Sequence, residues 1–349
     1  MLPIIVDRKI RLAVVGCGRI AGKHFGAIEK HSEDMELVAV CDNNPQILHE
    51  FMEKYGVPGF GKMGDMLESV HPDVVVLCTP SGLHPQQTIE AANAGVNVIT
   101  EKPMATRWAD GLSMVRACDE RRVRLFVVKQ NRMNATLQLL KRAVVEKRFG
   151  RIHMVHLNVF WTRPQEYYDQ GKWRGTWELD GGAFMNQASH YVDLIEWLIG
   201  PVADIQAMTS THRDIEVEDT GVMNVRWRNG ALGSMAVTMC TYPKNYEGSI
   251  TIIGEKGIVR IGGVAVNEIQ TWDFEDERPY DKDVAQSSYE TTSVYGFGHP
   301  LYYKNVVEVF RGVAEPDTDG REGLKSLEVL IAAYLSARDG RTVSLPLEY

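Results

Sequence analysis

The sequence predicts an α/β protein with an N-terminal doubly wound parallel sheet and a C-terminal α+β domain containing a large, mainly antiparallel open sheet. Two observations carry this prediction. In residues 1–130 short apolar runs alternate with amphipathic segments, the pattern of β-α-β units whose strands are buried on both faces. After Gly150, long segments of alternating apolar and polar residues follow one another with few helices between them. We therefore expect domains at 1–130 and 131–349.

The individual elements follow from residue type and spacing. In the first domain, Val/Ile/Leu-rich strands are predicted at 10–15, 36–40, 74–78, 96–99 and 124–128, and helices at 21–31, 46–55, 85–94 and 105–121. In the second domain, strands are predicted at 151–161, 220–227, 231–239 and 248–253, with helices at 182–199, 301–310 and 323–338. Asn229-Gly230 predicts a hairpin between two of these strands, and 274–295 is expected to be a long loop.

Charge and composition exclude several classes of protein. The 349 residues contain 38 Lys+Arg and 46 Asp+Glu, a net charge of −8, without a long basic run, so nucleic acid is not expected as a partner. There is no signal-peptide pattern and no apolar stretch long enough to span a membrane. The five cysteines form no C-x-x-C pair, which favours a cytoplasmic protein without disulfides.

A glycine-rich turn follows the first predicted strand and opens the first predicted helix. It reads Gly16-Cys17-Gly18-Arg19-Ile20-Ala21, a G-x-G-x-x-A pattern in the strand–turn–helix context that dinucleotide binding requires. Gly16 permits the tight turn, Gly18 lets a pyrophosphate approach, and we expect these residues with Arg19 and Ile20 to contact the cofactor at the helix N-terminus. Asp42 ends the second strand, where a carboxylate accepts ribose hydroxyls and repels a 2′-phosphate, so NAD is preferred to NADP. The alternative is an ordinary glycine turn with a solvated aspartate.

Two further loops leave the carboxyl ends of predicted parallel strands, the edge at which such sheets bind ligands. Thr79, Ser81 and His84 follow the strand at 74–78, and we expect them to flank the dinucleotide; turn and cap chemistry is the alternative. Glu101 and Lys102 follow the strand at 96–99 and are also predicted to lie at the cofactor. A lysine there would stabilise a developing alkoxide during hydride loss, although a surface lysine is the simpler interpretation.

The predicted helix at 182–199 carries polar residues where a solvated face would carry Lys and Glu. Asn186, His190 and Asp193 share one face at helical spacing. His190 is the predicted general base and Asp193 a group that would orient it; a surface or buried structural histidine is an equally open alternative.

Aromatic and basic residues precede this helix. Arginine pairs with phosphates and carboxylates, and aromatic rings cover the apolar faces of sugars and bases. We predict that Arg163, Tyr167, Trp173 and Arg174 bind an anionic sugar, with packing aromatics as the alternative. No His/Cys cluster has metal-ligand spacing, and His153 and His156 point to opposite faces of a strand, so no metal site is predicted.

Taken in order, these motifs resemble the Gfo/Idh/MocA oxidoreductase family over the full length of the chain. The resemblance rests on Gly16–Ala21, Thr79-Pro80 with His84, Glu101-Lys102-Pro103, and Gly181-Gly182 with His190-x-x-Asp193. It implies a Rossmann domain with an open-sheet domain, a bound nicotinamide cofactor, oxidation of a sugar or cyclitol hydroxyl, and Lys102 and His190 as the catalytic residues. It also implies a homodimer or homotetramer formed through the open sheet, for which 231–239, with its methionines and small residues, is the candidate surface.

The chain departs from the family pattern at two positions. The family's glycine triplet reads Asp180-Gly181-Gly182, and the usual aspartate four residues before the histidine is Asn186, so His190 would act without an Asp partner there. The segment 181–193 with Lys172-Trp173-Arg174-Gly175 is most similar to the WlbA-type UDP-N-acetylglucosaminuronate 3-dehydrogenases. That resemblance implies NAD-dependent oxidation at C3 of a UDP-linked uronic acid for lipopolysaccharide O-antigen, with Lys102, Asn186 and His190 among the substrate-binding residues. The alternatives are a dehydrogenase of a free aldose or cyclitol such as inositol, and a non-catalytic NAD-binding sensor or assembly protein.

Overall fold

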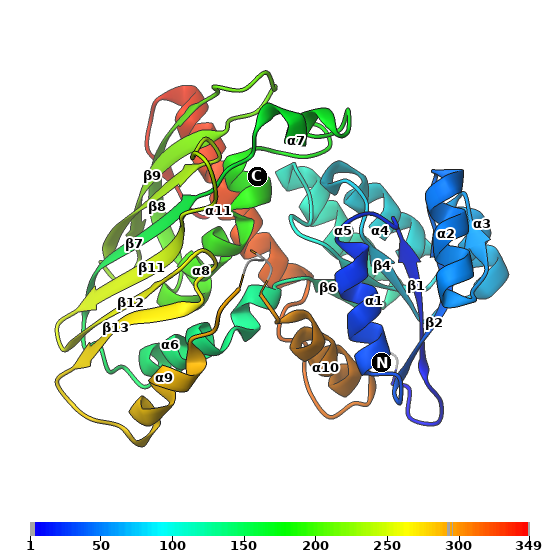
Figure 1. Cartoon of the computed structure of the whole chain (residues 1–349), viewed down its shortest axis with the longest axis horizontal. Helices are drawn as coiled ribbons and strands as arrows, with labels where there is room; N and C mark the ends of the chain where they lie inside the picture. The colour runs from blue at the N-terminus through cyan, green and yellow to red at the C-terminus, as the bar shows by residue number, and fades with distance from the viewer. Residues whose placement is uncertain (1–3, 292–293, 295, 348–349) are drawn as a thin grey trace. The chain divides into compact units, whose positions relative to one another are not determined.

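The computed structural model describes residues 4–291, 294 and 296–347, which divide into two compact units (Figure 1). The first unit comprises the described residues up to Lys129 together with His299–Leu324. The second comprises Gln130–Gly298 and the residues from Lys325 onward. Residues 299–324, which the division at residue 130 placed in the second domain, thus belong to the first unit. The reason is packing, because the buried side of this segment, including Tyr303, Val306 and Phe310, joins the core of the first unit.

The first unit is built on a six-stranded parallel sheet in the order β3-β2-β1-β4-β5-β6. Its strands are β1 (Ile10–Val15), β2 (Met35–Cys41), β3 (Gly59–Phe60), β4 (Val74–Leu77), β5 (Asn97–Thr100) and β6 (Leu125–Val127). All pairs are parallel. The order reverses between β1 and β4, and ligands of such sheets bind at the carboxyl ends of the strands beside this switch point. The predicted doubly wound sheet is confirmed.

Helices cover this sheet on both faces. They are α1 (Ala21–Lys30), α2 (Pro45–Tyr55), α3 (Met63–Val70), α4 (His84–Asn93), α5 (Trp108–Arg121) and α10 (His299–Phe310), with a 3₁₀ turn at Ser81–Leu83. Strands β1 and β4 are buried along almost their whole length, as expected for apolar runs with helices above and below. Strand β3 and helix α3 were not predicted from the sequence.

The second unit contains an eight-stranded sheet in the order β13-β12-β11-β7-β10-β9-β8-β14. Its strands are β7 (Ile152–Phe160), β8 (Val202–Ser210), β9 (Thr220–Trp227), β10 (Leu232–Thr238), β11 (Glu247–Gly254), β12 (Gly257–Gly262), β13 (Glu268–Phe274) and β14 (Val343–Ser344). β10 pairs with β7 in parallel and the other pairs are antiparallel. This mixed but mostly antiparallel sheet confirms the predicted fold class.

Helices lie against one face of this sheet, as Figure 1 shows for α6, α8 and α11. The helical segments of the unit are a 3₁₀ turn at Gln130–Met133, α6 (Ala135–Val145), α7 (Gln165–Asp169), a π-helical turn at Ala183–Gln187, α8 (Ser189–Ile199), a 3₁₀ turn at Pro279–Asp283, α9 (Val284–Ser287) and α11 (Gly320–Asp339), whose first turn belongs to the first unit. Trp227 of β9 is buried on the covered face and donates from Nε1 to Ile195 O of α8 at 3.1 Å.

The other face of the sheet exposes apolar side chains. Met208 of β8 and Leu232 of β10 are 68% and 52% exposed. The methionines of the segment 231–239 are not among these side chains. Met235 and Met239 are fully buried, because side chains alternate between the two faces of a strand and these two point to the helix-covered face. The part of the predicted assembly surface that rested on the methionines of 231–239 is therefore wrong.

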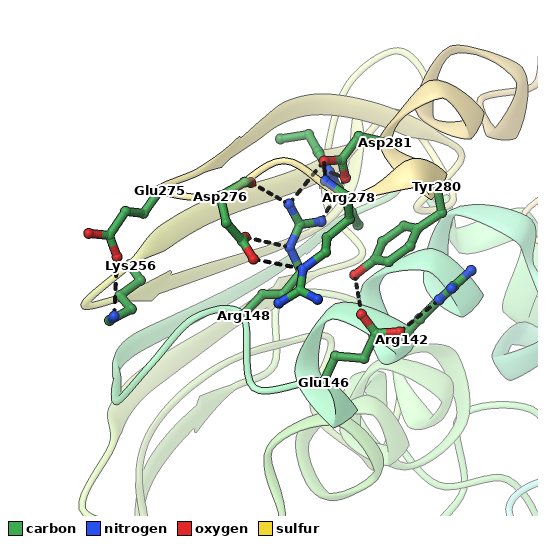
Figure 2. A network of polar contacts seen from close by, with 10 residues as sticks. Arg142, Glu146, Arg148, Lys256, Glu275, Asp276, Arg278, Tyr280 and Asp281 are labelled. Carbon is green, nitrogen blue, oxygen red and sulfur yellow. Dashed lines mark hydrogen bonds and ion pairs between the residues drawn. The ribbon is translucent and has the colours of Figure 1, made fainter.

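The segment after β13, predicted as a loop, is held in place by the buried guanidinium of Arg148 (Figure 2). Arg148 donates from NH1 to Asp281 Oδ1 at 2.6 Å and from Nε to Asp276 Oδ1 at 3.1 Å. Trp272 Nε1 donates to the same Asp281 oxygen at 2.8 Å. Burial alone would raise the pKa of Asp281, but these donors outweigh it and lower that pKa to about 2. Residues 279–287 are consequently helical turns fixed to the sheet.

Candidate active site

The glycine turn lies at the carboxyl end of β1, where α1 begins. Gly16 has φ +86°, and a Cβ there would lie 2.8 Å from the backbone carbon of Cys78, so the turn packs directly on the end of β4. A Cβ at Gly18, in contrast, would meet no atom within 4 Å. Arg19 is exposed and Ile20 is half-buried beside it. The first turn of α1 contains no acidic residue, so its N–H groups and dipole favour an anion such as a pyrophosphate.

The carboxylate of Asp42 is fixed beside this turn. Its Oδ2 accepts from Cys17 N–H at 2.8 Å, and its Oδ1 accepts from Asn44 N–H at 2.8 Å. Each oxygen retains a lone pair for a further donor. The residues at the switch point thus fit an adenosine dinucleotide, with the pyrophosphate on α1 and the ribose hydroxyls at Asp42.

His84 joins the loops that follow β4 and β5. The buried ring places Nε2 2.9 Å from Thr79 O and Nδ1 3.0 Å from Pro103 O. Burial lowers the pKa of His84 and outweighs the two backbone contacts, which raise it. Ser81 is buried in the intervening turn, and Thr79 Oγ1 donates to Gln87 Oε1 at 2.5 Å. The predicted positions Thr79, Ser81 and His84 therefore belong to one connected loop structure.

Glu101, at the end of β5, is the centre of a buried polar cluster. Its Oε1 lies 2.9 Å from His24 Nε2 and 3.8 Å from His299 Nε2. His24 Nδ1 in turn lies 2.8 Å from the Tyr303 hydroxyl. Burial alone would raise the pKa of Glu101, but the two imidazoles outweigh it and hold the pKa well below its usual range. Glu101 is therefore an ionised carboxylate inside the first unit.

This cluster also fixes the backbone of Lys102, whose N–H donates to Glu101 Oε2 at 3.1 Å. The ligand atoms of His24, Glu101 and His299 all lie within 4.8 Å of one another, a spacing that a metal site shares. The 2.9 Å contact between His24 and Glu101 nevertheless engages the two atoms that a metal would bind. The arrangement is therefore that of a hydrogen-bonded anchor for the half-buried Lys102.

The predicted helix at 182–199 is two elements in the structure. Ala188 N–H bonds to Ala183 O at 2.8 Å, five residues back, which makes a π-helical turn, and regular helix α8 begins only at Ser189. Gly181 has φ +84° at the entry to this turn. The turn carries Asn186, whose Nδ2 donates to the carboxylate of the buried Asp180.

Glu218 and Tyr334 hold the π-helical turn through hydrogen bonds to its backbone N–H groups. Glu218 Oε1 accepts from Phe184 N–H and from the Tyr334 hydroxyl, each at 2.8 Å, while that hydroxyl accepts from Met185 N–H at 3.1 Å. Glu218 Oε2 is buried against Gly182, where a Cβ would lie 1.8 Å away. Burial, reinforced by Asp219, outweighs the donors and raises the pKa of Glu218 to about 7.

His190 lies one residue into α8 and is 6% exposed. Gln130 Nε2 lies 2.9 Å from His190 Nε2 and can donate a hydrogen bond to it. Asp193, predicted as the group that orients His190, binds Arg132 through both oxygens at 2.7 Å. The polar face of α8 therefore packs on the 3₁₀ turn Gln130–Met133.

The structure brings the predicted anionic-sugar residues together. Arg174 NH1 donates to the Tyr167 hydroxyl at 2.7 Å, and its guanidinium lies 4.5 Å from the ring centres of both Tyr167 and Trp173. Arg163 Nε donates to Gln187 Oε1 at 2.9 Å, and Gln187 Nε2 donates to the same tyrosine hydroxyl at 3.2 Å. We refer to Arg163, Tyr167, Trp173, Arg174 and Gln187 as the arginine–aromatic cluster.

Gln130, Gln187, Glu218 and Tyr334 were not predicted from the sequence. Glu218 meets Phe184 across 34 residues of chain, and Gln130 meets His190 across 60. One local feature pointed to such a contact: Gly182, because a glycine beside a helix start indicates close approach of another group. The sequence did not show that this group is Glu218.

The chain is similar to known proteins over almost its whole length. Residues 10–129 match the family model "Oxidoreductase family, NAD-binding Rossmann fold", and residues 141–345 match "Oxidoreductase family, C-terminal alpha/beta domain". Among curated proteins, the chain is 25% identical to a myo-inositol 2-dehydrogenase of Thermotoga maritima, covering 96% of this chain and 98% of that protein. It is 25% identical to a D-apiose dehydrogenase of Paraburkholderia graminis, covering 97% and 90%.

Two solved structures are much more similar. The WlbA dehydrogenase of Chromobacterium violaceum, in complex with NADH and UDP-GlcNAcA, is 65% identical with a TM-score of 0.96, covering 100% of this chain and 99% of that one. The WlbA dehydrogenase of Bordetella pertussis, also with NADH and UDP-GlcNAcA, is 62% identical with a TM-score of 0.97, covering 99% and 100%.

Proposed function

This chain belongs to the Gfo/Idh/MocA oxidoreductase family, and from that premise we propose that it oxidises the C3 hydroxyl of UDP-N-acetyl-D-glucosaminuronic acid to the 3-keto sugar with NAD. The observation that carries the proposal is the identity of 65% and 62%, over essentially the whole chain, to two enzymes crystallised with NADH and UDP-GlcNAcA. The inositol and apiose dehydrogenases are 25% identical, which supports the shared family more than a shared substrate.

The proposed chemistry assigns one role to each of the two reacting side chains. Bound NAD would supply the hydride acceptor. His190 takes the proton of the C3 hydroxyl on Nε2, the nitrogen that Gln130 now contacts as a donor. Lys102 hydrogen-bonds the same oxygen and stabilises its developing negative charge. The C3–H bond breaks with its electron pair and the C3–O bond becomes a carbonyl, so one hydride and one proton leave the sugar.

The arginine–aromatic cluster supports an anionic substrate. Its two guanidinium groups already bond to neutral acceptors, Gln187 and Tyr167, rather than to carboxylates. Such donors can pair with a phosphate or a carboxylate without first breaking an ion pair within the cluster. The uronic acid carboxylate and the diphosphate are the groups that this cluster would recognise.

We further propose that the enzyme is cytoplasmic, serves lipopolysaccharide O-antigen synthesis, and assembles into a dimer or tetramer. Among the described residues no helix has the length and apolar character needed to cross a membrane. The uncovered face of the eight-stranded sheet supports assembly, because Met154, Met208, Val222 and Leu232 are all 40% exposed or more on it. Sedimentation of the pure protein tests this, and a monomer at micromolar concentration would contradict it.

The substrate is tested by incubating the protein with NAD and a matched set of sugars. We expect NADH formation with UDP-GlcNAcA and a product two mass units lighter, as loss of two hydrogens requires. UDP-GlcNAc tests whether the enzyme requires the carboxylate, and free N-acetylglucosaminuronic acid tests whether it requires the nucleotide. Myo-inositol tests the cyclitol alternative. Turnover of myo-inositol or a free aldose with UDP-GlcNAcA inert would contradict the proposal, and NAD binding without oxidation of any sugar would favour the sensor alternative.

A further inference from the structure

Asp180 and Asn186 form a side-chain pair just ahead of His190, and the proposed chemistry gives Asp180 no role. Asp180 is 1% exposed. One of its oxygens, Oδ2, accepts from Gly175 N–H at 2.6 Å, and the other accepts from Asn186 Nδ2. Gly175 is itself fixed, because its carbonyl oxygen accepts from Glu216 N–H at 3.0 Å and from Val217 N–H at 3.3 Å. The carboxylate is thus anchored on one side and bound to Asn186 on the other.

This pairing determines which way the Asn186 amide faces. A carboxylate only accepts hydrogen bonds, whereas an amide has one donating and one accepting side. Asn186 must therefore turn its NH₂ toward Asp180 and its carbonyl oxygen away. The backbone leaves little freedom to change this, because Asn186 N–H bonds to Gly182 O at 2.9 Å and Asn186 O accepts from Ser189 Oγ at 3.2 Å.

We propose that Asp180 is a positioning residue that holds the Asn186 amide so that its oxygen accepts a hydrogen bond from a hydroxyl of the substrate. The inference rests on the proposed function, which places Asn186 at the sugar. The two residues have different roles: Asp180 accepts from the amide NH₂, while the group offered to the substrate is a neutral amide oxygen that does not titrate. A carboxylate at position 186 without a donor to hold it would instead compete with His190 for the proton that the reaction releases.

The test is a cycle of Asp180→Asn, Asn186→Asp and the double variant that exchanges the two residues. Asn186→Asp places a second carboxylate against that of Asp180. We expect kcat/KM for UDP-GlcNAcA to fall about 30-fold or more. Asp180→Asn leaves the Asn186 amide able to pair in either orientation, and we expect a loss of about tenfold. In the exchanged protein the amide at position 180 donates to the carboxylate at position 186, whose second oxygen replaces the amide oxygen. We expect it to recover to within about threefold of the wild type.

Asn229→Asp is the matched control, since it makes the same change at the exposed hairpin between β9 and β10 and should leave kcat/KM unchanged. Two results would overturn the inference: Asp180→Asn within twofold of wild-type kcat/KM, or an exchanged protein no better than Asn186→Asp. A pair that served only folding would move the urea midpoint of Asp180→Asn without changing kcat/KM, which is the first of these results.

Failure of the proposed function is distinguishable. If the wild type oxidises another sugar, the same cycle is measured with that sugar. If the wild type oxidises no sugar, the proposed function fails on its own, and the cycle is then judged by urea unfolding. Because folding alone does not test the contact with the substrate, binding of UDP-GlcNAcA is also measured by calorimetry. An affinity restored by the exchange supports the inference, and additive losses, or no binding by the wild type, overturn it.

Discussion

The two units hold their proposed reacting groups in different ways. In the first unit the groups follow the ends of parallel strands, and partners at the end of the same or an adjacent strand fix them, as in Cys17 N–H on Asp42 and Lys102 N–H on Glu101. In the second unit a π-helical turn and the start of α8 carry the groups, and buried side chains from distant segments fix them, as Glu218 and Tyr334 do. The comparison teaches that a site on strand ends is a property of the fold, whereas a site on a distorted helix depends on individual side chains.

The largest effect is expected from the first unit, at Lys102. Lys102→Ala removes both the hydrogen bond to the reacting oxygen and its positive charge, and we expect kcat to fall about 10⁴-fold. The affinity for NAD, measured by fluorescence titration, should change little, because Asp42 and the glycine turn are untouched. Lys62→Ala, at an exposed lysine of the same unit, is the control. If the variant kept a tenth of the wild-type kcat, Lys102 would have no role in the chemical step.

The corresponding change in the second unit is His190→Gln. Loss of the base should lower kcat about 10³-fold, because water replaces the imidazole as proton acceptor. The pH dependence is the sharper measurement: the wild-type kcat should fall on the acid side as the imidazole gains a proton, and the variant should lack that fall. His212→Gln, at an exposed histidine of the same unit, should keep both the rate and the profile. An unchanged acid limb in His190→Gln would assign it to another group.

The pH dependence of the free energy of unfolding tests a buried carboxyl group of the second unit, Glu218. Burial raises the pKa of Glu218 from 4.5 to about 7, so the folded state binds this proton more tightly than the unfolded state does. The free energy of unfolding should therefore fall as pH rises through this range, by about 2–3 kcal/mol between pH 5 and pH 8 from this group. Glu218→Gln should lose that dependence in urea unfolding, and Glu216→Gln, at an exposed neighbour, should keep it. Equal pH slopes for wild type and Glu218→Gln would refute the assignment.

The smallest effect is expected at Asp42. Asp42→Ala loses one charged acceptor for the ribose hydroxyls and the contact to Cys17 N–H, and we expect NAD to bind about tenfold more weakly. Binding of NADP should weaken less or improve, because the repulsion of a 2′-phosphate is removed. Isothermal titration with both cofactors measures this, with Glu50→Ala on exposed α2 as control. A ratio of NAD to NADP affinity that stays at the wild-type value would contradict the ribose assignment.

The sequence predicted the first unit better than the second, because the residues that form the first unit's site lie close together in the chain. A parallel strand, its glycine turn and its helix are contiguous, so Gly16–Ala21 and Asp42 could be placed from spacing alone. The arginine–aromatic cluster is also local, since Arg163, Tyr167 and Arg174 lie within twelve residues of one another. Helical periodicity found Asn186 and His190 on one face but missed the π-helical turn that carries Asn186. That turn forms because Glu218 and Tyr334 bind its N–H groups, and Tyr334 lies 149 residues from Met185.

The Arg148 network has a consequence for how copies of the protein can meet. It fixes the segment after β13, and the chain that continues from there returns along the outer edge of β13, where Ser288 Oγ accepts from Ile269 N–H at 3.0 Å and Tyr289 N–H donates to Asn267 O at 3.0 Å. A strand from a second copy would have to displace these hydrogen bonds to extend the sheet at this edge. The bonds therefore protect the edge from edge-to-edge aggregation. Pairing at this part of the β13 edge is therefore blocked by the chain itself, whereas the uncovered face of the sheet stays accessible to a second copy.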